Sequence, residues 1–173
     1  RVVIVAKDGQ RLTVDVQAAL TYDGERQVKG MALVFRDMTL LHEAQTRANE
    51  LAAIVQSSQD AIIGKQLDGT ITSWNEAATA MFGYAPDEAI GQSVQMLIPP
   101  DRKAEEMRIV TDLSAGIRVP AFETRRRHRD GHLVDVSITI SPIRDAQGRI
   151  VGASKIARDI SSQKQAEALR VTG

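Results

Sequence analysis

The sequence predicts an α+β protein whose main part is a five-stranded antiparallel sheet with helices over one face. Ahead of that part it predicts a three-stranded fragment of the same kind of sheet and a linker helix. Two observations support the prediction. A set of strand and turn signals occurs twice along the 173 residues, and only the second set is preceded by two further strands and a series of short helices.

Two segments of the sequence recur. KDGQRLTVDV at residues 7–16 returns as RDGHLVDV at residues 129–136 if a two-residue gap is allowed, and GMALVFRDMT at residues 30–39 returns as GASKIARDIS at residues 152–161. The KDG and RDG turns are 122 positions apart, and so are the two Arg-Asp pairs. Self-similarity at a fixed offset indicates two copies of one structural unit.

Each copy is typical of three antiparallel strands. Asp8 and Asp130 each precede a glycine in a turn signal, and the residues after the turn alternate between apolar and polar. The third strand of each copy ends in an Arg-Asp pair, and a helix-favouring stretch follows. Asp37 and Asp159 are therefore expected to cap these helices by accepting backbone N–H groups.

The region before the second copy predicts two strands, at residues 61–67 and 70–75, and then a helical stretch. Glycines and a Pro-Pro pair divide this stretch into short helices, and its longest helix spans residues 100–116. Two strands, a helical middle and three further strands together make the predicted five-stranded sheet.

The predicted domain boundaries follow from this order. Residues 1–37 are the C-terminal strands of a first domain, 38–56 a linker helix, 57–160 a complete domain and 161–173 the start of an output helix. Because the first domain lacks its other strands and its helical cover, its sheet is expected to expose an apolar face or an edge. The chain begins without Met, and we expect it to be a piece of a longer protein.

The linker helix contains no Gly or Pro and has apolar residues three and four positions apart, which is the pattern of a short coiled coil. Two interpretations stay open on this pattern. The helix forms a dimer through the apolar seam, or it packs against its own domain. The predicted seam consists of Leu41, Ala44, Ala48, Leu51 and Val55.

Composition excludes several classes of function. Lys and Arg number 22 and so do Asp and Glu, so the formal net charge is zero and nucleic acid is not an expected partner. The chain has no cysteine, which excludes disulfides, thiolate metal sites and a cysteine nucleophile. No apolar run reaches the roughly 18 residues of a membrane helix, so no membrane contact is expected. The RRRHR run at residues 125–129 is interpreted as a solvated strand face.

The order and spacing of these signals resemble a PAS domain, the sensory module of histidine kinases, cyclic-di-GMP enzymes and transcription regulators. The resemblance rests on the segments SSQDAIIGKQLDGTITSWNEAATAMFG and FETRRRHRDGHLVDVSITISPIRDAQGRIVGASKIARDIS, and on the short DMT and DIS signatures, which match the family's Asp-Ile-Thr motif. It covers residues 53–170 as one domain and 1–39 as the end of another. It implies that a signal passes from strand to helix at a junction made by Arg36, Asp37, Thr39, Arg158, Asp159 and Ser161.

The resemblance also bears on cofactors, and none is expected. Light-sensing members need a cysteine in the short helix where this chain has Val94, so a covalent flavin adduct is disfavoured. Haem-binding members place a histidine on the long helix, where this chain has Glu105 and Glu106, so histidine-ligated haem is disfavoured. A methionine ligand from Met96 or Met107 stays open. No metal site is expected, because the two histidines at the second Asp-Gly turn lack further ligands.

The family fold is able to enclose a cavity between its helices and its sheet. Such a cavity would take an unidentified small molecule, whereas the preferred alternative is a core filled by its own side chains. Asn75 either caps a short helix or points a donor inward. The candidate lining residues are Ile62, Trp74, Asn75, Met81, Phe82, Met96, Leu97, Met107, Val110, Phe122, Ile138 and Ile156.

The sequence therefore predicts a sensory and signal-transducing segment of a larger cytoplasmic bacterial sensor that works as a homodimer. The preferred parent is a two-component histidine kinase, with the kinase or another output domain in the same chain. The alternatives are a receptor for a small molecule or a non-covalently bound flavin, and the PAS segment of a cyclic-di-GMP enzyme. No P-loop or nucleophile elbow is found, so the segment itself is not expected to be an enzyme.

Overall fold

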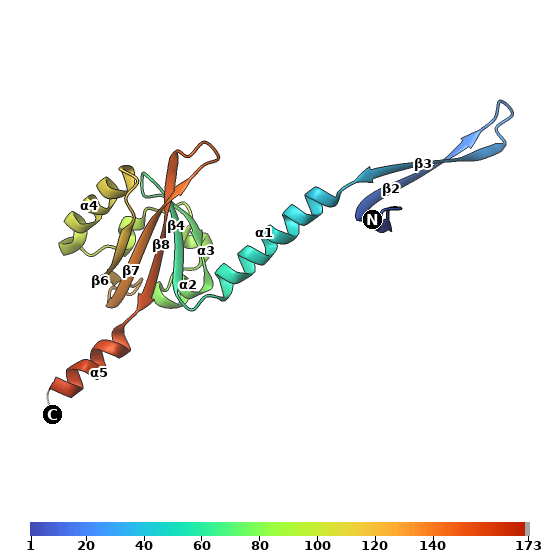
Figure 1. Ribbon diagram of the computed structural model, residues 1–173. Helices are drawn as coiled ribbons and strands as arrows, with labels where there is room; N and C mark the ends of the chain where they lie inside the picture. The colour runs from blue at the N-terminus through green and yellow to red at the C-terminus, as the bar shows by residue number, and fades with distance from the viewer. Residues whose placement is uncertain (172–173) are drawn as a thin grey trace. The chain divides into compact units, whose positions relative to one another are not determined.

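The computed structural model describes residues 1–171 of the chain (Figure 1). The chain divides into two compact units, the first ending at Ala53 and the second beginning at Ile54. The division falls within helix α1 (Thr39–Ser57). The predicted output helix extends to residue 173, and its last two positions, 172–173, lie outside the described residues.

The first unit contains a three-stranded antiparallel sheet in the order β1-β2-β3, followed by the start of α1. One face of this sheet carries most of its larger apolar residues because strand side chains alternate. Six of them are 37–61% exposed: Val2, Ile4, Leu20, Met31, Leu33 and Phe35. The strands are β1 (Val2–Val5), β2 (Arg11–Tyr22) and β3 (Val28–Asp37).

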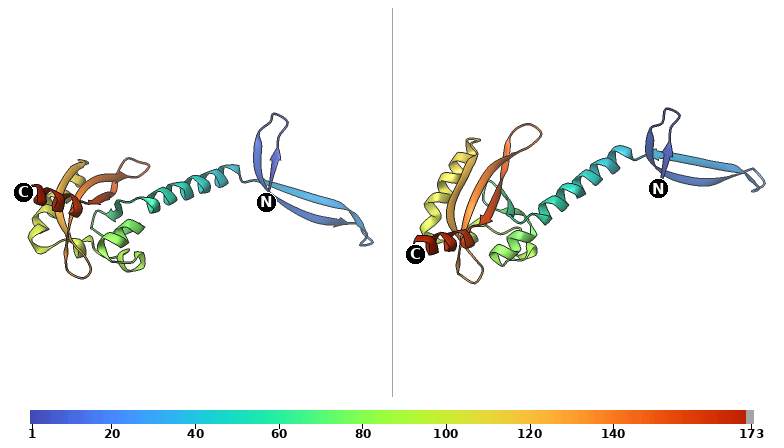
Figure 2. Two further views of the ribbon diagram at one scale, coloured as in Figure 1. Left: turned by 90° about the horizontal axis from the view of Figure 1, so that it is seen from below. Right: turned by 60° about the horizontal axis from the view of Figure 1, so that its bottom comes forward.

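The second unit is built on a five-stranded antiparallel sheet in the order β5-β4-β8-β7-β6, which confirms the predicted fold class. The helical segment lies between β5 and β6 in the chain (Figures 1 and 2). The strands are β4 (Ala61–Gln66), β5 (Ile71–Trp74), β6 (Val119–Arg127), β7 (Leu133–Arg144) and β8 (Ile150–Asp159). The helices are α2 (Glu76–Phe82), α3 (Pro86–Ala89), α4 (Lys103–Ser114) and α5 (Ser161–Val171), with 3-10 turns at Val94–Leu97 and Pro100–Arg102.

Turn and cap residues divide the helical segment as the sequence predicts. Asn75 caps α2 by accepting the N–H of Ala78 at 3.0 Å, and Gly83 ends it in the left-handed conformation, at φ +82°. Pro86 begins α3, where a missing N–H costs nothing. The segment between β5 and β6 therefore consists of several short helical elements and not of one long helix.

The core lies between the inner face of the sheet and the helical segment. Val136, Ile138 and Ile140 alternate along β7 and are fully buried. Trp74 at the end of β5 and Phe82 at the end of α2 join the same core, with their ring centroids 6.0 Å apart. The second unit thus has the single filled core that a domain of this size needs.

The two copies align without a gap. Val14 pairs with Asp37 in the first sheet, and Val136 pairs with Asp159 in the second. Both members of the pair are offset by 122 positions, so the predicted two-residue gap was wrong. The gap was suggested by the Val-Asp-Val triplets at residues 14–16 and 134–136, which are 120 positions apart instead of 122. The two triplets therefore do not occupy equivalent positions, because apolar residues recur at every second position of an alternating strand.

Candidate functional site

The second copy ends in a junction that joins strand β8 to helix α5. Asp159 Oδ1 accepts the backbone N–H of Ser161 at 2.8 Å, which caps the helix. The N–H of Ile160 donates to the carbonyl oxygen of Asp135 on β7 at 3.0 Å, and the Ile160 side chain is buried. The first turn of α5 is therefore tied both to its own strand and to the neighbouring one.

The first copy repeats this junction between β3 and α1. Asp37 Oδ1 accepts the N–H of Thr39 at 2.9 Å and its hydroxyl at 2.6 Å, and the N–H of Met38 donates to the carbonyl oxygen of Thr13 at 2.8 Å. The Thr39 hydroxyl, and then its N–H, hold the pKa of Asp37 below its usual value. The same strand-to-helix bonds thus occur at both copies of the predicted signature.

Arg158, the residue before Asp159, makes a two-pronged ion pair with Asp60. Its Nε lies 3.1 Å from Asp60 Oδ1 and its Nη2 lies 3.0 Å from Oδ2, which raises the pKa of the guanidinium. Asp60 lies in the loop between α1 and β4, so the pair connects the incoming and outgoing ends of the domain. Arg36, the matching residue of the first copy, is exposed and lies opposite Asp15.

Asn75 joins the end of α1 to the core. Its Oδ1 accepts the N–H groups of Ile62 at 2.9 Å and Ala78 at 3.0 Å. Its Nδ2 donates to the carbonyl oxygens of Val55 at 2.9 Å and Asp60 at 3.0 Å. Asn75 is 1% exposed, so its amide group is shielded from water. Both roles that the sequence left open for Asn75 are therefore filled by one side chain.

Helix α5 is held to the sheet by Lys164. Its Nζ lies 3.1 Å from Glu123 on β6 and 3.5 Å from Asp135 on β7. The contact with Glu123 is the main cause that raises the pKa of Lys164. Sequence reasoning missed Asp60, Lys164 and Asp135, because each acts through a partner distant in the chain.

Three charged side chains lie together inside the domain. Lys65 on β4, Glu106 on α4 and Lys155 on β8 are only 2–3% exposed. Lys65 Nζ lies 2.5 Å from Glu106 Oε1, and Lys155 Nζ lies 3.5 Å from Glu106 Oε2. Arg126 on β6 is 1% exposed and bonds to Glu105 at 2.8 Å. We call Lys65, Glu106, Lys155 and Arg126 the buried charge cluster.

Burial and neighbouring charges set the pKa values in this cluster. The pKa of Lys155 is lowered to about 7, mainly by burial; Glu106 opposes this lowering, and the charges of Lys65 and Arg126 add to it. Burial alone would raise the pKa of Glu106, but Lys155, Lys65 and Arg126 together hold it below its usual value. The interpretation of the RRRHR run as a solvated face was wrong for Arg126, because alternation turns this one side chain inward.

A sequence model described as the PAS fold matches residues 49–160, well over half of the chain. The chain belongs to the PAS family. This confirms the predicted resemblance for the complete domain, and the part matched covers the five-stranded sheet together with the end of α1. The assignment of residues 1–39 to the end of another PAS domain stays a prediction.

The PAS domain is similar to several known proteins. It is 29% identical over 127 residues to the signal transduction histidine-protein kinase AtoS of Escherichia coli, and 30% identical over 148 residues to the C4-dicarboxylate transport sensor protein DctS of Rhodobacter capsulatus. These alignments cover 73% and 82% of this chain, but the chain spans only about a fifth of either relative, 20% and 22%. The crystal structure of a PAS domain from Colwellia psychrerythraea matches with a TM-score of 0.61 and 30% identity, covering 67% of this chain and 98% of that one.

Among the described residues, no helix has the length and apolar character needed to span a bilayer.

Most of the predicted cavity residues of the PAS domain pack in its core. Trp74, Asn75, Phe82, Leu97 and Ile138 are buried. Met81, Met96 and Phe122 are partly buried and pack against the same core. Whether a small molecule ever displaces part of this packing stays a prediction.

The prediction was wrong for Met107 and Ile156, which are exposed. Met107 is 72% exposed, because α4 turns Glu106, Ile109 and Leu113 toward the core instead. Ile156 is 41% exposed, because β8 turns Lys155 and Ala157 inward. Two further candidates are only half-buried: Ile62, which pairs with Ile156 on the outer face, and Val110.

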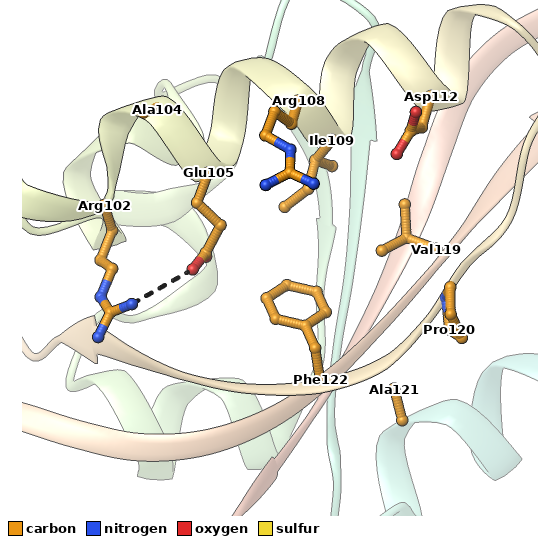
Figure 3. Close-up of a pocket in the computed structure, with 10 residues that line it drawn as sticks. All are labelled: Arg102, Ala104, Glu105, Arg108, Ile109, Asp112, Val119, Pro120, Ala121 and Phe122. Carbon is orange, nitrogen blue, oxygen red and sulfur yellow. Dashed lines mark ion pairs between the residues drawn. The ribbon is translucent and has the colours of Figure 1, made fainter.

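A groove of about 510 Å³ lies on the surface of the PAS domain between α4 and β6 (Figure 3). Of the predicted cavity residues only Phe122 lines it. Its walls carry charges of both signs, with Arg102 3.8 Å from Glu105 and with Arg108 and Asp112 further along the helix. The groove can therefore accept a ligand with an apolar part and polar ends.

The β6–β7 turn brings together His128, Asp130 and His132, with one donor atom of each within 4.8 Å of the others. The prediction that the two histidines lack a further ligand was wrong, because the carboxylate of Asp130 lies close to both. The imidazoles stack with an angle of 22° between their planes, so their in-plane lone pairs do not converge on one ion. Asp130 accepts the N–H of His132 at 3.0 Å, as Asp8 accepts that of Gln10, so the cluster serves the turn.

The predicted seam of α1 faces solvent in the single chain. Leu41 is 63% and Leu51 59% exposed, and Ala44 and Ala48 are exposed as well. Val55 is half-buried. The seam is thus an exposed apolar stripe, and the dimer through it stays a prediction.

Proposed function

We propose that this segment is the sensory and signal-relay part of a sensor histidine kinase, and that it works as a cytoplasmic homodimer with its output domain in the same chain. The observation that supports this most directly is the Arg158–Asp60 ion pair beside the Asp159 cap. It links the loop after the incoming helix α1 to the first turn of the outgoing helix α5. A shift at the end of α1 therefore reaches α5 through two adjacent side chains.

We also propose that this segment has no catalytic activity and no covalent cofactor. The segment catalyses no reaction itself, and it holds no covalent flavin, since it contains no cysteine. The named relatives are a histidine kinase and a sensor protein, which favours a kinase over a cyclic-di-GMP enzyme as the parent.

The dimer is proposed to form through the α1 seam. We expect the change Leu51→Asp to convert a dimer of this chain into a monomer at micromolar concentration, because it places a charge in the middle of an apolar stripe. Sedimentation velocity or light scattering after gel filtration measures the change. The matched control is Thr46→Asp, which adds the same charge on the opposite side of the helix. A dimer that survives Leu51→Asp would contradict this route.

The Arg158–Asp60 pair is proposed to act in relay rather than in stability. Arg158 is 70% exposed, so we expect Arg158→Gln to leave the free energy of unfolding almost unchanged. We expect it to speed amide exchange in the first turn of α5 and in the loop around Asp60. The exchanged pair, Asp60→Arg with Arg158→Asp, should recover the slow exchange. If amide exchange is unchanged in Arg158→Gln, the Arg158–Asp60 pair takes no part in the relay.

The groove between α4 and β6 favours a second candidate function, a receptor for a small molecule. An absorption spectrum and a native mass of freshly purified protein test it. A bound mass or chromophore that is lost on Phe122→Ala supports the receptor, and an apo mass with no absorption beyond that of Trp and Tyr supports the relay alone.

A further inference from the structure

The buried charge cluster has no counterpart in the first copy. At the constant offset of 122, Lys155 corresponds to Leu33 and Arg126 corresponds to Ile4. The three strands that the two copies share have the same order and register, so the strands themselves accept an apolar side chain at these places. Replacing buried ion pairs by apolar side chains is often neutral or stabilising. The charges of the complete domain therefore call for a reason other than folding.

The cluster holds one positive charge too many for a balanced core. The buried cations Lys65, Lys155 and Arg126 face two carboxylates, those of Glu106 and Glu105, and Glu105 is also 3.8 Å from the more exposed Arg102. Lys65 and Arg126 each make a short contact, of 2.5 Å and 2.8 Å. The contact of Lys155 with Glu106 is 3.5 Å, beyond the usual length of a hydrogen bond. Of the three cations, Lys155 thus has the longest contact with a carboxylate and gives up the weakest attraction when it releases its proton.

The position of Lys155 connects it to the output. It lies on β8 four residues before Asp159, and its partner Glu106 lies on α4. The groups that face it are Lys65 from β4, Arg126 from β6 and Glu106 from α4. A change in its charge therefore alters the attraction between α4 and the strand that leads into α5.

We propose that the buried charge cluster is a proton-binding site centred on Lys155, and that its occupancy is a signal that this PAS domain passes to helix α5. The proposal rests on the proposed relay function and names what is sensed. With the proton bound, Lys155 attracts Glu106 and the core holds the surplus charge. With the proton released to water, the core is balanced and Glu106 pairs with Lys65 alone. The lowered pKa of Lys155, near 7, places this change in the physiological range.

The test is an NMR titration of this chain with labelled lysine side chains and backbone amides, from pH 5.5 to 9. We expect Lys155 to titrate with a midpoint near pH 7. We expect the amides of Ser161 and Lys164 to shift with the same midpoint. The change Lys155→Leu, which introduces the residue type found at position 33, should abolish that amide shift, and Lys103→Leu should leave it unchanged.

The wild-type titration decides the matter even if Lys155→Leu folds poorly. A Lys155 that stays charged up to pH 9 overturns the proton site. A Lys155 that titrates while the α5 amides stay fixed overturns its role as a signal. Neither result depends on the dimer, so a failure here is distinct from a failure of the relay, which the Leu51→Asp and Arg158→Gln variants test at constant pH.

The pH dependence of stability gives a second readout. The folded-state pKa of Lys155 lies below its unfolded value of about 10.5, so the unfolded chain binds more protons between these two values. The free energy of unfolding should therefore rise with pH above about 7 relative to that of Lys155→Leu. A parallel pH dependence in the two proteins would contradict a buried Lys155.

Discussion

The change Glu106→Leu is expected to destabilise the complete domain by about 3–5 kcal/mol at pH 7, because it leaves Lys65 and Lys155 buried without a carboxylate. Both ammonium groups would then have to lose their protons or draw water into the core. Urea unfolding followed by tryptophan fluorescence measures the loss. Trp74 is the single tryptophan and is buried in the second unit, so it reports on that domain alone.

A rescue variant separates loss of charge balance from loss of packing. We expect the triple change Lys65→Met, Glu106→Leu and Lys155→Leu to recover most of the lost stability, because it replaces the whole ion cluster by apolar groups. The position equivalent to Lys155 in the first sheet is already Leu33, which shows that the strand geometry accepts leucine. A triple variant as unstable as Glu106→Leu would mean that the volume of Glu106, and not its charge, matters.

The same cluster shows what sequence reasoning could not reach. Lys65 and Glu106 are 41 positions apart, and Arg158 and Asp60 are 98 apart. Nothing in the local pattern of either member indicates such a partner. A lysine in a strand or a glutamate on a helix is normally placed in solvent, and only the packing of β4, β8 and α4 turns these side chains inward.

Features that depend only on residues close together in the chain could be predicted from the sequence. The caps at Asp37 and Asp159, the turn at Asp130 and the alternation along β7 depend on neighbouring residues, and all of them could be predicted. The sequence could not predict which face of α4 turns toward the core. Glu106 and Met107 are adjacent, and hydrophobicity alone would bury the methionine. The exposed methionine and the buried glutamate reverse that expectation because two lysines lie on the facing strands.

The effect of Asn75 is expected to be nearly as large as that of Glu106. The change Asn75→Ala removes four hydrogen bonds at once and leaves the carbonyl oxygens of Val55 and Asp60 without their donor. Each lost bond to a buried group costs about 1 kcal/mol or more, so we expect a loss of about 3 kcal/mol in the free energy of unfolding. Trp74 fluorescence again measures it.

A second variant distinguishes the two roles of Asn75. Asn75→Asp keeps the oxygen that caps α2 and replaces the donor to α1 by an oxygen that repels the carbonyl groups it faces. We therefore expect fast amide exchange at residues 55–60 while α2 stays protected. The matched control is Gln56→Ala, which removes an exposed bond between the same two elements, the 3.1 Å contact with the N–H of Glu76. If Asn75→Asp opens α2 as readily as the end of α1, Asn75 acts as a simple helix cap and the link between incoming helix and core lies elsewhere.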